Sequence, residues 1–304
     1  MCSRIIRARR LAARPRRTQA LVAWLFLLPF LAPFVLFWAA PIVHGLYLSF
    51  TNASLTGAEE RFVGLANYQR LLADPTYRRA LGNTVVFVVE NVPVLLVAGL
   101  LLALLLNQSM PGLAAIRAAF VAPYLITASA VAIIWQFVLD PATGLLNVWL
   151  AEVGLPTQRW LSEPGQAMGA IVLITLWWRV GFPLLVLLAG LQEIPGELYE
   201  AARLDGAGAW QRFWRITLPL LAPVLFFVLI IRLIDSFKVF AQVYLVTGGG
   251  PVGSTRVLIQ YLYETGFQDF RTGYAAAIGW SLFVIILGVT AIQMRLLRRY
   301  GADE

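Results

Sequence analysis

The sequence carries little charge. Only 13% of its 304 residues are Asp, Glu, Lys or Arg, whereas soluble domains carry roughly 25%. Hydrophobic residues make up 60% of the chain, and a soluble protein of this size could not bury that much apolar surface in one core. The composition therefore excludes an ordinary soluble protein and predicts an integral membrane protein without a sizeable soluble domain.

Cysteine and histidine are nearly absent, with one of each, Cys2 and His44. A single cysteine cannot form an internal disulfide, and no signal sequence precedes Cys2 to make it a site of lipid attachment. We expect His44, at the end of an apolar stretch, to be structural. So few ligands make a zinc or iron site improbable, and we predict no metal, no cofactor and no catalytic residue.

Six stretches are long and apolar enough to cross a bilayer, which takes about 20 mostly apolar residues. The first four run over residues 20–43, 84–106, 118–139 and 167–191, the fifth begins near Ile216, and the sixth covers residues 272–294. Segments that are polar or rich in Gly and Pro connect them, as expected outside the hydrocarbon. The sequence therefore predicts an all-α, polytopic membrane protein with six transmembrane helices.

Arginine and lysine are distributed unevenly between the two sides of these spans. With the N-terminus inside, fourteen cations fall on the cytoplasmic side, eight on the outer side and two within spans. Positive residues favour the cytoplasmic side, so both termini are predicted to be cytoplasmic. We expect a basic tail over residues 1–19, a transmembrane domain over residues 20–299 and a short tail over residues 300–304. The net charge of +8 then fits cytoplasmic flanks and anionic lipid, not nucleic acid.

The connection after the fourth span, residues 191–219, carries the most informative pattern. Pro195 and Glu197 favour the start of a helix, and Asp205-Gly206 ends it. A second helix is expected to begin near Ala207 and to run into the fifth span. Small residues at 201, 202 and 206–209 leave the backbone accessible to a closely approaching partner. An ordinary loop whose short helices pack on the spans is the alternative interpretation.

The complete spacing of this connection is more specific than its parts. It reads Glu200-Ala201-Ala202, three residues, Gly206, nine residues, then Ile216-x-Leu218-Pro219, which resembles the EAA loop of bacterial ABC-importer permeases. The likeness extends over nearly the whole chain after the basic tail, through residues 41–50, 62–68, 122–124, 134–135, 144–147, 188–192 and 247–251. Together these segments resemble the carbohydrate-uptake class, and within it the MalF- or UgpA-type first permease. MalF itself has extra spans and a large outer domain, and we expect this sequence to form only the six-span core.

The resemblance implies a MetI-like permease core in the bacterial inner membrane and a set of partner proteins. A solute-binding protein delivers the substrate to the outer loops, a second permease of the MalG type completes the path, and two ATPase subunits power alternating access. Glu200 is then the carboxylate that meets the ATPase, and Ala201, Ala202 and Gly206 permit close docking. Asp205 either contacts the partner or caps the second helix.

A glycine-rich segment, Gly248-Gly-Gly-Pro-Val-Gly253, fits the nucleotide-binding pattern G-x-G-x-x-G and nearly completes a P-loop. Ser254 stands where the P-loop lysine belongs, and no βαβ unit surrounds the segment. The predicted topology also places it outside the cell. We therefore expect a turn-rich gate or docking loop at the mouth of the fifth span.

Charged residues within spans are costly and usually face a cavity or a partner charge. Two interpretations stay open here: an internal ion pair, joining Arg232 to Asp235 or Arg179 to Glu90, or side chains that line the path of the substrate. Aromatic rings beside hydrogen-bonding groups suit sugars, and in the resembling family the substrate contacts come from the corresponding fourth and fifth spans. The candidate path residues are Trp178, Arg179, Phe182, Arg232, Asp235 and Ser236.

These observations favour the permease subunit of an ABC importer for a sugar or related polyol, which itself is not an enzyme because ATP hydrolysis resides in its partners. The two arginines in spans equally suit a phosphorylated solute such as glycerol 3-phosphate. A multispan membrane enzyme is the alternative from another class, but it would need clustered acidic or histidine residues at one interface. An ion-driven secondary transporter would work without an ATPase.

Overall fold

The computed structural model describes residues 16–57, 59–108 and 110–300, and its side chains are described within residues 21–295. Of the two predicted tails, residues 1–15 and 301–304 lie outside these ranges. Within the described ranges the fold is helical, and β pairing is confined to an isolated antiparallel bridge between Thr51 and Phe62. The prediction of an all-α polytopic fold is confirmed.

Within the described residues, the N-terminal half contains ten helical elements. They are α2 (Arg16–Phe34), the π-helical turn η1 (Val35–Ala39), α3 (Ala40–Leu48), α4 (Ala66–Ala73), α5 (Pro75–Leu106), α6 (Leu113–Val121), the 3₁₀ turn η2 (Ala122–Leu125), α7 (Ala128–Val138), α8 (Leu145–Glu152) and α9 (Pro164–Arg179).

The C-terminal half follows with α10 (Gly181–Gln192), α11 (Gly196–Leu204), α12 (Ala209–Arg212), the π-helical turn η3 (Phe213–Thr217), α13 (Leu218–Phe237), α14 (Ala241–Val246), α15 (Leu258–Tyr263), the π-helical turn η4 (Glu264–Gln268) and α16 (Thr272–Tyr300).

Four of the six predicted spans are continuous helices of sufficient length, and two are bent. The continuous spans are residues 21–48, 75–106, 209–237 and 272–295. The helix pair of residues 113–125 and 128–138 bends by 103°, and the pair of residues 164–179 and 181–192 bends by 49°. The described part of the chain therefore has six candidate spans when each bent pair counts as one.

The predicted single helix over residues 118–139 is wrong in its shape. The helix begins earlier, at Leu113, and turns sharply between η2 and α7. Pro123 lies in η2 and has no backbone N–H to continue the α-helical ladder. Thr127 then begins a new helix, because its side chain accepts a hydrogen bond from the backbone N–H of Ala130 at 3.4 Å.

The fourth predicted span also departs from a straight helix, with its bend between α9 and α10. Pro183 cannot donate to the carbonyl of Arg179 and its ring crowds that turn, which is a common cause of helix kinks. Gly181 permits the last turn of α6 to approach closely here, since a Cβ at this position would lie 2.9 Å from the carbonyl oxygen of Phe120.

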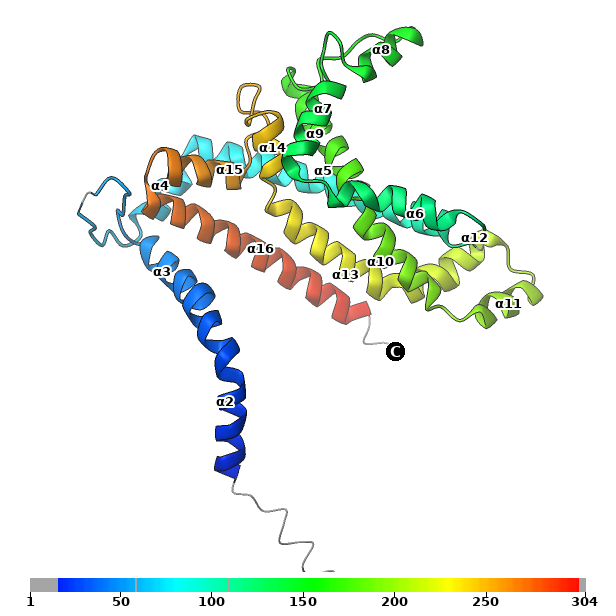
Figure 1. Cartoon of the computed structure of the whole chain (residues 1–304), viewed down its shortest axis with the longest axis horizontal. Helices are drawn as coiled ribbons and strands as arrows, with labels where there is room; N and C mark the ends of the chain where they lie inside the picture. The colour runs from blue at the N-terminus through cyan, green and yellow to red at the C-terminus, as the bar shows by residue number, and fades with distance from the viewer. Residues whose placement is uncertain (1–15, 58, 109, 301–304) are drawn as a thin grey trace, which may run out of the picture.

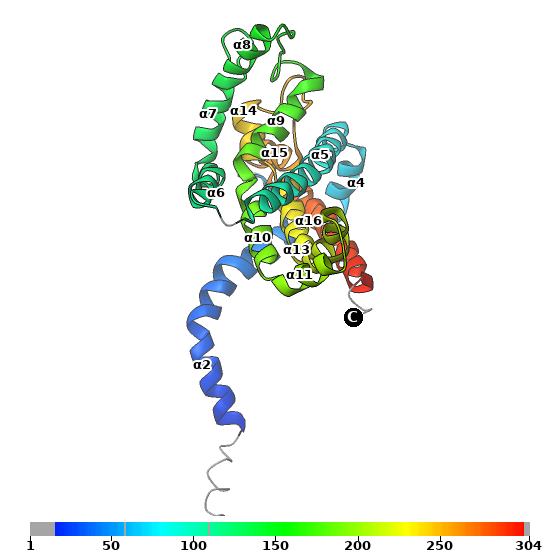
Figure 2. The same cartoon turned by 90° about the vertical axis from the view of Figure 1, so that its right-hand side faces the viewer.

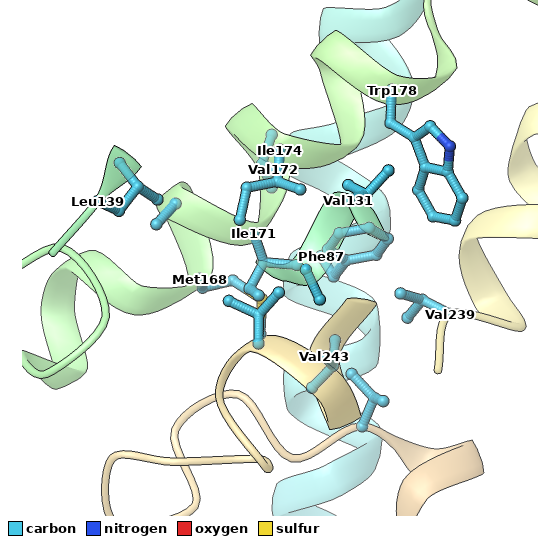
Figure 3. Close-up of a cluster of buried hydrophobic side chains, with 14 residues drawn as sticks. Phe87, Val131, Leu139, Met168, Ile171, Val172, Ile174, Trp178, Val239 and Val243 are labelled. Carbon is cyan, nitrogen blue, oxygen red and sulfur yellow. The ribbon is translucent and has the colours of Figure 1, made fainter. Parts of the chain in front are cut away.

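Helix α5 lies at the centre of the packing and contacts α9, α10, α13 and α15. Its 32 residues, at about 1.5 Å of rise each, exceed the roughly 30 Å of the hydrocarbon core. In one buried cluster, Phe87 of α5 meets Ile171 of α9 and Val243 of α14 (Figure 3). Further buried clusters join α5 to α15 and α16 and to α10 and α13.

The two ends of the bundle carry different segments. Helix α11 and the last turns of α16 lie toward one end, and α4 and α15 lie toward the opposite end (Figures 1 and 2). Helix α2 projects away from the other helices (Figure 1), and none of the span over residues 21–48 is buried within the chain. Many large apolar side chains are exposed, among them Phe26 at 79%, as expected for helices that face lipid.

Candidate functional site

A cavity of about 460 Å³ lies where α5, α9 and α13 meet. Its lining is unusually polar for a membrane bundle and includes four charged side chains, Arg179, Arg232, Asp235 and Lys238. The uncharged polar lining residues are Asn91, Tyr124, Thr175, Ser236 and Gln242. Four of the six predicted path residues therefore line one cavity: Arg179, Arg232, Asp235 and Ser236.

Arg232 and Asp235 form the ion pair that their spacing on one helix suggests. The Nη2 atom of Arg232 donates to Oδ2 of Asp235 at 2.9 Å, and the Arg232 side chain is 4% exposed whereas that of Asp235 is 50% exposed. The pair and the cavity are not exclusive alternatives, because both residues also line the cavity. One turn away, Ser236 accepts a hydrogen bond from Asn91 at 2.9 Å, which joins α13 to α5.

The alternative pairing of Arg179 with Glu90 does not form. Within the described part of the chain, Arg179 has no carboxylate within 4.0 Å, and Glu90 is exposed. The Arg179 guanidinium instead lies over the Trp178 ring, with its Cζ 3.7 Å from the ring centroid, and 5.2 Å from the ring of Tyr124. Aromatic faces, not an acid, hold this cation in place.

Trp178 and Phe182 do not line the cavity, but each ring contacts an arginine that does. Trp178 is buried in the cluster of Figure 3, and its indole N–H donates to the carbonyl of Ile126 at 3.1 Å. Phe182 stacks on Tyr124 and lies 4.4 Å from Cζ of Arg232. Both rings therefore position the charged groups of the cavity.

Several polar lining residues were missed by the sequence reasoning. Thr175 lies four residues before Arg179 and so shares its helix face, and Asn91 is an isolated amide in an apolar stretch; both signals were available. Tyr124 and Gln242 reach the cavity from η2 and α14, and their proximity depends on bends that no local pattern indicates.

Helix α11 is a short, exposed helix outside the bundle (Figure 1). Glu200, Ala201 and Leu204 are exposed, Leu204 by 90%, and Ala202 is half-buried. Glu200 forms no ion pair with any described residue. The helix is tied to the entry of α13 by a hydrogen bond of 2.9 Å between Tyr199 and Thr217. The chain thus holds α11 in place while leaving its acidic and small side chains uncovered.

Gly206 ends α11 in a left-handed conformation with φ of +79°. The N–H of Ala207 donates to the carbonyl of Ala202 at 2.8 Å, and the N–H of Gly206 donates to that of Arg203 at 3.1 Å. This pair of bonds is the Schellman motif, in which glycine avoids the penalty of a Cβ at positive φ. Gly206 therefore shapes the loop, whatever it also contributes to docking.

Asp205 does not cap the second helix. Asp205 is the C-cap residue of α11, directly after Leu204. The N-cap residue of α12 is Gly208, whose N–H donates to Oε1 of Gln211 at 3.0 Å. The capping alternative for Asp205 is therefore wrong. The second helix begins at Ala209, close to the predicted start, and continues through η3 into α13.

The glycine-rich segment forms a tight loop with positive φ at Gly248, Gly249 and Gly253. Asn83 of α5 donates to the carbonyls of Gly253 and Arg256, both at 2.9 Å, so the loop is fixed to the outer part of α5. Its surroundings are helical within the described residues and provide no strand-to-helix turn for a nucleotide.

Comparison with known proteins extends over nearly the whole chain. Residues 71–301 match the family described as "Binding-protein-dependent transport system inner membrane component". The "Probable ABC transporter permease protein YurN" of Bacillus subtilis (strain 168) is 36% identical over 288 residues, which cover 93% of this chain and 98% of the relative. The "sn-glycerol-3-phosphate transport system permease protein UgpA" of Yersinia pestis is 33% identical over 288 residues, with coverages of 94% and 97%.

Solved structures agree with these sequence matches. A chain in the crystal structure of a bacterial ABC transporter involved in the import of the acidic polysaccharide alginate has a TM-score of 0.82 and 27% identity, and the match covers 93% of this chain and 96% of that one. A chain of the bacterial alginate transporter in complex with an alginate pentasaccharide-bound periplasmic protein has a TM-score of 0.82 and 26% identity. Both matches extend over almost the full helical bundle.

Proposed function

This chain belongs to the binding-protein-dependent transport system inner membrane components, the multi-pass membrane subunits of ABC importers, and from that membership we propose that it forms one side of the path by which a sugar or related polyol crosses the bacterial inner membrane. A second permease of the MalG type forms the other side. Two ATPase subunits drive the transport, and an extracytoplasmic solute-binding protein delivers the substrate.

The exposed helix α11 is the observation that carries this proposal. Glu200, Ala201, Ala202, Asp205 and Gly206 form the coupling surface, a patch of small and acidic residues that is exposed except at the half-buried Ala202. Small side chains allow the backbone of α11 to approach a partner closely, and Glu200 supplies a carboxylate for an arginine or lysine on the ATPase. The Tyr199–Thr217 hydrogen bond links movement of α11 to α13, which lines the cavity.

The cavity supports a polyhydroxy substrate. Amide and hydroxyl groups of Asn91, Ser236 and Gln242 can bond to sugar hydroxyls, and Tyr124 and Phe240 provide aromatic surface for the apolar face of a sugar ring. The relatives named above include a glycerol 3-phosphate permease and a transporter for a polysaccharide, which agrees with this class of solute. Glycerol 3-phosphate itself is the alternative substrate.

A charge reversal at Glu200 tests the coupling surface. The protein is produced together with the ATPase, second permease and binding protein of its importer, and the complex is isolated through a tag on this chain. In Glu200→Lys, a lysine faces the basic group of the ATPase, and such like-charge contacts cost several kcal/mol. We expect the affinity for the ATPase to fall by roughly 100-fold or more and ATP-driven uptake to be lost, while membrane insertion is unchanged.

The matched control is Glu152→Lys, the same change at an exposed position on α8, which projects from another part of the molecule (Figure 1). This variant should bind the ATPase as strongly as the wild type does. Normal assembly and uptake of Glu200→Lys, or equal loss in the two variants, would show that the coupling surface is assigned incorrectly.

A further inference from the structure

The charges that line the cavity do not balance. Three cations, Arg179, Arg232 and Lys238, face a single carboxylate, that of Asp235. Asp235 is shared, because its Oδ2 bonds to Arg232 at 2.9 Å and its Oδ1 lies 4.0 Å from Nζ of Lys238. Unpaired charge buried within a membrane protein is costly, and this cost falls on the two arginines, because the Lys238 side chain is 55% exposed. A surplus of positive charge at this place therefore calls for a negative group that the described chain does not supply.

Arg232 is held with part of its hydrogen-bonding capacity unused. The residue is 3% exposed, one nitrogen bonds to Asp235, and the buried Nε finds no acceptor among the described residues. Phe182 covers one face of the guanidinium. A buried donor without an acceptor is costly, so an acceptor that enters the cavity with the solute would relieve this cost.

Arg179 is prepared to bind an anion. Trp178 and Tyr124 lie against its guanidinium, and no described carboxylate lies within 4.0 Å of it. Stacking occupies the face of a guanidinium and leaves its edge N–H groups free, and these edges match a carboxylate or phosphate with two parallel bonds. The Oδ1 atom of the buried Asn91 also lacks a donor and suits a solute hydroxyl.

We infer that the solute is an anionic polyhydroxy compound, a sugar acid or a sugar or polyol phosphate, and that Arg179 and Arg232 bind its acidic group while Asn91 bonds a hydroxyl. This inference rests on the proposed importer function and narrows its substrate class. Carboxylate and phosphate share the chemistry that the arginines recognise, and transport measurements separate the two.

The experiment uses the complete importer in proteoliposomes with its own binding protein. ATP-driven uptake is compared for three matched pairs: glucuronate against glucose, galacturonate against galactose, and glycerol 3-phosphate against glycerol. We expect uptake of at least one anionic probe and no more than background uptake of its neutral partner. Uptake of a uronate indicates a carboxylate solute, and uptake of glycerol 3-phosphate indicates a phosphate.

Variants then connect this preference to the cavity. Arg179→Gln should reduce uptake of the anionic probe by roughly tenfold or more, since a hydrogen bond to a charged group is lost. Arg179→Lys keeps the charge without the planar edge and should retain a measurable part of the rate. Arg295→Gln removes an exposed cation near the end of α16 that does not line the cavity, and it should leave uptake unchanged.

Neutral probes transported as well as their anionic partners, or uptake of none of the anionic probes, would overturn the inference. Co-purification of the ATPase and hydrolysis stimulated by the binding protein would show that the importer function stands in that case. Loss of both readouts would contradict the proposed function instead. If Arg179→Gln fails to assemble, the comparison of probes in the wild type and the uptake rate of Arg179→Lys still test the inference.

Discussion

Asp74 joins three segments at the outer end of the bundle through one carboxylate. Its Oδ1 accepts from the backbone N–H groups of Thr76 and Tyr77 at 2.8 and 3.3 Å and so caps α5. Its Oδ2 accepts from the phenol groups of Tyr261 and of Tyr274, the latter at 2.7 Å. Burial alone would raise the pKa of Asp74, but these hydrogen bonds outweigh it and hold the pKa below its ordinary value.

This arrangement makes stability depend on the charge of Asp74. A pKa that is lower in the folded state contributes stability above the unfolded value of about 3.9, and this contribution is lost as the pH falls through the lower, folded pKa. We expect Asp74→Asn to lower the free energy of unfolding by about 1 kcal/mol or more at pH 7, since charge-assisted bonds to two phenols are lost.

The difference in the free energy of unfolding between the wild type and Asp74→Asn should shrink as the pH falls below about 4, because the wild-type carboxylate then becomes protonated and uncharged. Thermal unfolding of the protein in detergent, followed by tryptophan fluorescence, measures both effects. Asp269→Asn, which removes a half-exposed ion pair with Arg271, serves as the control and should change stability little. Equal destabilisation of the two variants, or a constant loss across this pH range, would contradict the assigned role.

At the scale of elements, α5 and α10 approach each other closely at Gly99. A Cβ on this residue would lie 2.5 Å from Cβ of Pro183 and 3.3 Å from the backbone N of Leu184. Small residues allow such close helix contacts in membranes. Because the obstacle is a proline ring and backbone, it cannot move aside as a flexible side chain would.

Gly99→Ala should therefore destabilise the bundle by about 1–3 kcal/mol through overpacking. Gly82→Ala is the matched control, since it lies on the same helix and a Cβ there meets nothing within 4 Å. That substitution should be neutral or slightly stabilising because alanine favours helix. Thermal unfolding in detergent measures both variants, and equal effects of the two would show that the close approach at Gly99 contributes nothing.

The existence of the helices could be predicted from the sequence, whereas their bends could not. Long apolar stretches indicate membrane spans wherever they occur. The start of a helix near Ala207 could be predicted because Asp205-Gly206 ends the preceding helix. The 103° turn after η2 follows a segment, the end of α6, that packs closely against Gly181 of α10. This contact belongs to the tertiary structure, and the apolar pattern of residues 118–139 does not indicate the bend.

The candidate cavity was predictable where its residues share one helix. Arg232, Asp235 and Ser236 follow each other at spacings of three and four on α13, so their common face could be recognised. Gln242 and Lys238 follow the end of α13, where the chain changes direction, and Tyr124 comes from a 3₁₀ turn. Trp178 was expected to line the path, but its position beside Arg179 turns it toward the buried cluster.

At the scale of the molecule, the described chain leaves several surfaces uncovered, and two of them bear on its partners. The span over residues 21–48 has no buried residue, and α11 lies outside the bundle (Figure 1). The cavity has polar walls contributed by α5, α9 and α13. This combination suits a subunit that other proteins complete: a second permease beside the bundle and an ATPase against α11.

Site-directed crosslinking tests this arrangement most directly. Cys2→Ser removes the native thiol, and Ala201→Cys on α11 or Trp149→Cys on α8 then introduces a single exposed attachment point for a benzophenone maleimide. After illumination of the assembled complex, our account predicts an adduct between the ATPase subunit and Ala201→Cys and none with Trp149→Cys. Absence of the ATPase adduct at position 201, or an equal yield at position 149, would contradict the claim that α11 couples this permease to its ATPase.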